Sequence, residues 1–141
     1  MTIKQLSIFI ENKGGSLIKV LDMLSKAGIQ IVALTIADTI GYGICRIICD
    51  EPSRAYIKLK EGGINVQLTD VNAVYVEDKC GEAARTLKII SDAGVGINYM
   101  YSFPLKDKGV IVFRTSDSVK TNEIISLNKL ASVMEGDFKK K

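Results

Sequence analysis

The stretch KGGSLIKVLDMLSKAGIQI at residues 13–31 returns as KCGEAARTLKIISDAGVGI at residues 79–97. The same offset of 66 residues relates further identical pairs without a gap, among them Glu11 and Glu77, and Gly43 and Gly109. A constant register over this length indicates an internal duplication. We therefore expect one domain over residues 1–69, a second over residues 70–135, and a solvated tail over residues 136–141.

Both units show the same order of expected elements. Strands follow from alternating apolar residues or short apolar runs, and helices from apolar residues spaced along one helical face. In the first unit we expect strands at residues 3–11, 29–36, 44–49 and 64–68, and helices at about 16–27 and 52–60. In the second we expect strands at residues 73–77, 96–103 and 109–114, and helices at about 81–93 and 118–127. Residues 130–134 are compatible with a last strand or with a continued helix.

The resulting order is βαββαβ in each unit. Strand–helix–strand crossovers are almost always right-handed, and two of them give a four-stranded antiparallel sheet with both helices on one face. The sequence therefore predicts an α+β fold of two ferredoxin-like units docked side by side. Residues 29–36 are apolar on both strand faces, so we also expect the second unit or another chain to cover the face opposite the helices.

Composition narrows the possible environment and partners. No apolar run reaches the roughly 18 to 20 residues of a membrane span, and the N-terminus lacks the features of a signal peptide. We expect a cytoplasmic protein with no membrane partner. The net charge of +3 includes three terminal lysines, so nucleic acid is not an expected partner either. Units of about 70 residues bury little surface alone, so we expect a homodimer.

The three cysteines, Cys45, Cys49 and Cys80, form neither an even disulfide framework nor a CxxC pair. We interpret them as structural thiols in a reducing compartment. Cys80 precedes the second unit's first helix, where thiol pKa values tend to fall, so a reactive thiol is the alternative to an inert turn residue.

The run Lys13-Gly14-Gly15-Ser16-Leu17, followed by Ala27-Gly28-Ile29-Gln30-Ile31 and repeated in βαββαβ order, resembles the ACT domain. This family consists of small regulatory modules that bind amino acids and related metabolites. Both repeats match, over about residues 2–68 and 71–134, and the tandem arrangement is similar to that of stand-alone double-ACT proteins. The resemblance implies an allosteric sensor of a small-molecule amino acid that acts on a metabolic enzyme or regulator.

The resemblance also implies where the ligand binds, since in ACT domains the first turn of one unit faces the second strand of another. Glycines let the backbone approach a ligand, and the first N–H groups of a helix attract a carboxylate. Acceptors for the ammonium group are Asn12 and Asp78. The candidate site residues are Asn12, Lys13, Gly14, Gly15, Ser16, Leu17, Asp78, Cys80, Gly81, Asn98 and Met100.

Other interpretations of these residues remain open. The Gly14-Gly15-Ser16 run is also compatible with a plain tight turn in which Ser16 is the helix N-cap. Asn98 and Met100 share one strand face, and for this face a ligand seam is one of two equally open interpretations. The aromatic residues of the opposite face, Tyr99, Tyr101 and Phe103, are typical of core. Glu82 opposes a carboxylate at the second turn, so we expect the first turn to hold it.

No catalytic constellation is visible in the sequence. The chain has no histidine, which removes the commonest general base and metal ligand, and it has no Walker or dinucleotide motif. We therefore expect a protein that is not an enzyme and needs neither cofactor nor metal. The alternative from another class is a structural or RNA-binding plait, but the third strand offers Ile44, Arg46 and Ile48 rather than aromatic platforms.

Overall fold

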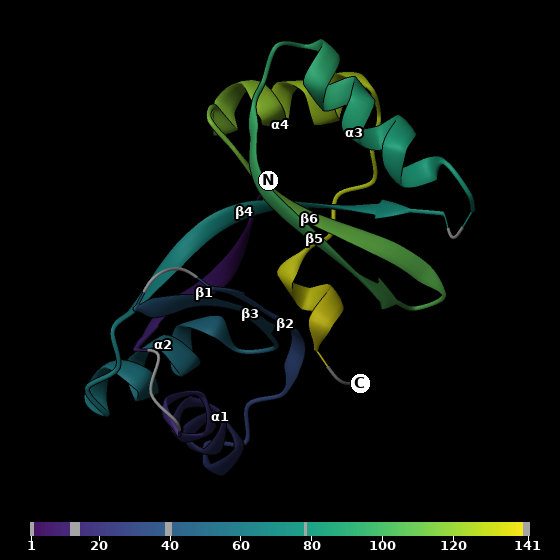
Figure 1. Ribbon diagram of the computed structural model, residues 1–141. Helices are drawn as coiled ribbons and strands as arrows, with labels where there is room; N and C mark the ends of the chain where they lie inside the picture. Colours follow the sequence, from purple (N-terminus) through teal and green to yellow (C-terminus); the bar gives the residue numbers. More distant parts are fainter. Residues whose placement is uncertain (1, 12–14, 39–40, 78, 140–141) are drawn as a thin grey trace. The chain divides into compact units, whose positions relative to one another are not determined.

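A computed structural model describes residues 2–11, 15–38, 41–77 and 79–139 (Figure 1). The first repeat contains β1 (Ile3–Glu11), α1 (Ser16–Lys26), β2 (Ile31–Asp38), β3 (Tyr42–Cys49), α2 (Pro52–Glu61) and the start of β4 (Val66–Val76). The second continues from β4 with α3 (Glu82–Asp92), β5 (Ile97–Leu105), β6 (Lys108–Thr115) and α4 (Ser118–Leu127). A 3-10 helix, η1 (Glu135–Phe138), follows. The predicted α+β fold of two ferredoxin-like repeats is confirmed.

The duplication is also visible in the backbone. Helices α1 and α3, and likewise α2 and α4, begin and end at the same 66-residue offset that relates the sequences. Four pairs of positions with positive φ obey it as well: Gly15 and Gly81, Gly28 and Gly94, Gly41 and Asp107, and Gly63 and Lys129. The two repeats therefore share their turns as well as their helices.

Contacts within the chain form two compact units. The first domain comprises Lys4–Thr69 together with η1, and the second domain comprises Asp70–Met134 together with Ile3. Neighbouring strands follow the order β2-β3-β1-β4 in the first domain and β4-β6-β5 in the second. Strand β4 is thus the last strand of one repeat and the first of the next. No described helix is long and apolar enough to cross a membrane.

In each domain the core lies between the sheet and its two helices (Figure 1). In the first domain, Leu6 and Ile8 of β1 lie opposite Ile47 and Cys45 of β3 and pack with residues of α1 and α2. The second domain repeats this arrangement with Val74, Ile111 and Phe113 against α3 and α4. Helices α1 and α3 are amphipathic, and their buried residues Val20, Leu24 and Ile90 belong to these cores.

The end of the second repeat settles an alternative that the sequence left open. Val74 of β4 forms an antiparallel bridge with Ser132, and the Tyr75 N–H donates to the Ala131 carbonyl at 2.8 Å. Residues 131–133 therefore act as the last strand. The helix before them ends without glycine, because Lys129 adopts a φ of 54° and the Asn128 side chain donates to the Ile124 carbonyl at 2.9 Å.

Two expectations were wrong. The strands expected at residues 64–68 and 73–77 form one strand, β4, because no glycine or proline interrupts the segment between them. The expected solvated tail begins with η1, where the Phe138 side chain is only 6% exposed. There the Lys4 N–H donates to the Glu135 carboxylate at 2.9 Å. Apolar burial of Phe138 explains why this segment does not remain in solvent.

The sheet face opposite the helices of the first domain is unevenly buried. Gln5 and Ile48 are fully buried there, whereas Phe9 and Tyr42 are 41% and 44% exposed. Residue Leu34 of β2, opposite Ile47 in the ladder, is exposed on the other face. The expected cover of the face opposite the helices, by the second unit or by another chain, stays a prediction.

Candidate functional site

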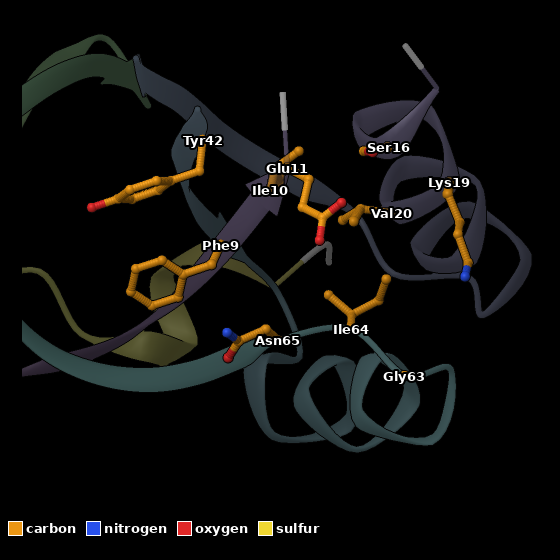
Figure 2. Close-up of a pocket in the computed structure, with 10 residues that line it drawn as sticks. All are labelled: Phe9, Ile10, Glu11, Ser16, Lys19, Val20, Tyr42, Gly63, Ile64 and Asn65. Atoms are coloured by element: carbon orange, nitrogen blue, oxygen red, sulfur yellow. The ribbon is translucent and has the colours of Figure 1, made fainter. Parts of the chain in front are cut away.

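The first domain contains a pocket of about 450 Å³ where the end of β1 meets the first turns of α1 (Figure 2). Its walls come from β1, α1, the start of β3 and the loop between α2 and β4. The lining residues are Phe9, Ile10, Glu11, Ser16, Lys19, Val20, Tyr42, Gly63, Ile64 and Asn65. The volume is in the range of pockets that take small molecules.

The start of α1 faces this pocket, because Ser16 is one of the lining residues. Gly15 is the N-cap, with φ 91° and ψ −13°, so the expected N-cap role of Ser16 is wrong. A side chain at Gly15 would meet nothing within 4 Å, and the left-handed φ is therefore what favours glycine. Within the part of the chain that the structure describes, no side chain caps the helix, and its first turn has no acidic residue. The first N–H groups of α1 lack intrahelical acceptors and carry the positive end of the helix dipole.

Opposite charges line the pocket. Glu11 ends β1, and Lys19 lies one turn into α1; Figure 2 shows the Glu11 carboxylate between the aromatic side chains and the helix. Lys19 is exposed and has no salt-bridge partner among the described residues. Together with the start of α1, Lys19 forms an electropositive wall that suits a carboxylate.

The other end of the pocket is aromatic. The rings of Phe9 and Tyr42 have centroids 6.2 Å apart and an interplanar angle of 45°. Glu11 lies directly opposite Tyr42 in the β1–β3 ladder, so carboxylate and rings belong to the same sheet face. In Figure 2 the rings lie on one side of Glu11, and Ser16 and Lys19 lie on the other. The pocket is thus polarised along its length.

The second domain has a pocket of about 410 Å³ at the equivalent place. Each of its ten lining residues follows its counterpart in the first pocket by 66 positions: Tyr75, Val76, Glu77, Glu82, Arg85, Thr86, Lys108, Lys129, Leu130 and Ala131. The duplication therefore produced two copies of one pocket.

The charges of the second pocket are compensated within the second domain. Glu82 replaces Ser16 and pairs with Arg85 at 3.0 Å, while Glu77 pairs with Lys79 at 3.1 Å. Hydrogen bonding and charge attraction from Lys79 lower the pKa of Glu77. Likewise, Glu82 raises the pKa of Arg85. An incoming carboxylate would compete with Glu82 for Arg85.

The whole chain, residues 1–141, matches the family described as ACT domain pair. The chain belongs to this family. A crystal structure of a protein from Bacteroides thetaiotaomicron is 38% identical, with a TM-score of 0.92 over 100% of this chain and 98% of that one. The resemblance that the glycine turns and element order indicated is therefore confirmed.

More distant structures share the fold. The regulatory subunit of aspartate kinase from Thermus thermophilus, in a ligand-free form, is 12% identical, with a TM-score of 0.60 over 89% of this chain and 91% of that one. The corresponding subunit from Thermus flavus is 13% identical, with a TM-score of 0.58 over 89% and 90%. No match was found among proteins of curated function.

The predicted site residues fall into three groups in this ACT domain pair. Ser16 lines the first pocket, and Gly15 and Leu17 flank it in the chain. Asn12, Lys13, Gly14 and Asp78 lie outside the described residues. The remaining four belong to the second domain and do not line its equivalent pocket: Cys80, Gly81, Asn98 and Met100. A role of Asn98 and Met100 across a seam stays a prediction.

Sequence reasoning missed most of the pocket's distinctive side chains. Glu11 was visible as one of the identical pairs, and Lys19 has a basic counterpart in Arg85, so the repeat itself held a signal for both. Phe9 and Tyr42 gave none, because they meet only through the pairing of β1 with β3.

The cysteines are not part of either pocket. Cys45 and Cys49 are buried in the first domain, and burial raises the pKa of each thiol to about 11, as expected of structural thiols. Cys80 is exposed. Among the described residues, no group of three or more acidic or cysteine side chains could hold a metal ion.

Proposed function

We propose that the first domain binds a free amino acid in its pocket and transmits occupancy to a partner protein, without catalysing a reaction. The observation that carries this proposal is the juxtaposition, in one pocket of about 450 Å³, of the start of α1 with Lys19 and the carboxylate of Glu11. A zwitterion carries the opposite charges, a carboxylate for the helix start and an ammonium group for Glu11. Membership in the ACT domain pair family supports this class of ligand.

The partner and the assembly belong to the same proposal. We expect a cytoplasmic homodimer whose downstream partner is a metabolic enzyme or regulator. The exposed apolar residues Leu34 and Ile36 on β2 support association with a second copy, because a strand with exposed apolar side chains gains from being covered. The contacts expected from Asn98 and Met100 would complete the site across a domain seam.

A thermal-shift screen of the twenty amino acids tests the binding proposal. A ligand at 100 times its Kd stabilises the folded state by about 2.7 kcal/mol, which gives a clear rise in Tm. We expect Lys19→Gln to reduce that rise. Lys58→Gln is the matched control, since Lys58 is also an exposed helical lysine but does not line the pocket. No shift with any amino acid would refute the proposal.

One observation favours the RNA-binding alternative. Phe9 and Tyr42 are exposed on β1 and β3, on the sheet face where RNA-binding plaits place stacking rings. The acidic Glu11 beside them works against a phosphate backbone. Single-stranded RNA that binds the wild type but not Phe9→Ala, in the absence of any amino acid response, would establish this alternative.

A further inference from the structure

Three aliphatic residues of the first pocket continue the core of the first domain. Ile10, Val20 and Ile64 line this pocket and come from β1, α1 and the loop between α2 and β4. Val20 belongs to the buried core cluster, and Ile10 and Ile64 are partly buried against it. Figure 2 shows the side chains of Val20 and Ile64 away from the rings of Phe9 and Tyr42. We call the three aliphatic residues the aliphatic wall.

The second domain has a more polar version of this wall. At the equivalent positions it has Val76, Thr86 and Leu130, so its wall includes a hydroxyl group. Directly before Leu130 it has Lys129, where the first domain has Gly63. Gly63 has no side chain, and a Cβ there would meet nothing within 4 Å. The first domain therefore combines a wholly aliphatic wall with open space at its rim.

We infer that the amino acid bound by the first domain has an apolar side chain, which packs on the aliphatic wall. This inference rests on the proposed function and specifies the ligand class of that same pocket. An apolar side chain that covers the wall removes its own surface and that of the wall from water, which favours binding. A polar side chain would lose hydrogen bonds to water there, and the hydrocarbon side chains of the wall offer none in return.

Titration calorimetry with two pairs of amino acids tests the inference on the full chain. Leucine and asparagine have side chains of similar shape, as do methionine and glutamine, but the first member of each pair is apolar and the second carries an amide. All of them have the same α-carboxylate and α-ammonium groups, so each pair isolates the side chain. We expect the apolar member to bind at least about tenfold more tightly, because of the hydrophobic gain from burying a side chain of this size.

The variant Ile64→Thr places a hydroxyl group in the aliphatic wall and keeps the branch at Cβ. We expect the preference for the apolar member to fall by about fourfold, which corresponds to the contribution of about one buried methylene group. Ile31→Thr is the matched control, since Ile31 is also a partly buried isoleucine packed against the same core but does not line the pocket. We expect this control to keep the preference. Melting curves verify that both variants fold.

The outcomes separate the inference from the proposed function. Equal affinity within both pairs, or tighter binding of the amide, would overturn the inference and leave amino acid binding intact. An unchanged preference in Ile64→Thr would overturn the assigned wall. An equal loss of preference in Ile31→Thr would also overturn it, because the loss would then follow from a weakened core. If no amino acid binds the wild type, the proposed function fails and the inference fails with it.

Discussion

The two pockets share a backbone and differ in their side chains. Both lie at the same offset and follow a left-handed glycine, Gly15 or Gly81, at the start of a helix. The first exposes Lys19 next to the neutral Ser16, whereas the second pairs Arg85 with Glu82. The two pockets therefore use equivalent backbone positions, while the first turn of the helix carries the neutral Ser16 in one and Glu82, paired with Arg85, in the other.

The cores differ as well, and this gives the largest expected effect. Cys45 and Cys49 of the first domain correspond to Ile111 and Thr115 of the second, so only the first core contains thiols. Burial raises the pKa of each thiol from 9.0 to about 11, and nearby Asp50 adds to this for Cys49. Below pH 9 both thiols are neutral in the folded and unfolded states. Above it only the unfolded state ionises, so stability falls as pH rises toward 11.

We expect this loss to reach about 2 kcal/mol for each cysteine by about pH 10.5. Melting temperatures between pH 8 and about 10.5, compared between the wild type and Cys45→Ala/Cys49→Ala, would measure it, since the other titrating groups are common to both proteins. Cys80→Ala is the control, because this thiol is exposed. A double variant with the wild-type pH dependence would contradict the assignment.

Removing the carboxylate from each pocket tests which copy binds. Glu11→Gln should weaken amino acid binding by about tenfold, because a charge-assisted contact is lost. Glu77→Gln is the matched change in the second pocket, where Glu82 pairs with Arg85 and opposes an incoming carboxylate, and should leave the affinity unchanged. Calorimetric titration of both variants measures the difference. Equal losses would show that both pockets are occupied.

Much of this fold could be predicted from the sequence because the duplication repeats each signal. Glycines at the turns and apolar stripes on the helices located both repeats. Strand β4 was predicted as two strands because Thr69 and Asp70 do not show clearly whether the strand continues or ends. The burial of Phe138 was missed because the lysines after it suggest a solvated tail. One aromatic residue, Phe138, was a weak signal for burial beside the three lysines that follow it.

The site was predictable only where it is local. Ser16 directly follows Gly15 in the sequence, so the place of Ser16 in the pocket could be anticipated. The remaining walls come from β3 and from the loop after α2, which approach β1 through long-range strand pairing. For example, the Phe9 N–H donates to the Asn65 carbonyl at 3.0 Å across 56 residues of chain. Such contacts have no periodic signature in a single sequence.

Exchanging the residues just after the second helix of each repeat tests whether the two repeats tolerate the same backbone conformation equally well. Gly63 and Lys129 both adopt positive φ, 80° and 54°, but only glycine does so without strain. Gly63→Lys should destabilise the protein by about 1 kcal/mol, and Lys129→Gly should cost nothing or stabilise it slightly. Urea denaturation measures both. A Cβ at Gly63 would meet nothing within 4 Å, so a larger loss would mean that strain is not the cause.

The smallest expected change in stability comes from Glu82→Ser, which gives the second pocket the residue of the first. Its ion pair with Arg85 is partly exposed, with side-chain exposures of 25% and 62%, so losing it should cost less than about 1 kcal/mol.

The consequence for binding should be larger, because Arg85 and the start of α3 become available to a carboxylate. We expect the stoichiometry to rise from one ligand per chain to two, with weaker affinity at the new site since Lys108 still covers the Tyr75 ring. Glu61→Ser, which removes an exposed acidic residue of α2, controls for net charge and should keep one site. A single site in Glu82→Ser would show that Glu82 does not determine occupancy, and two sites in the wild type would show that the two pockets are functionally equivalent.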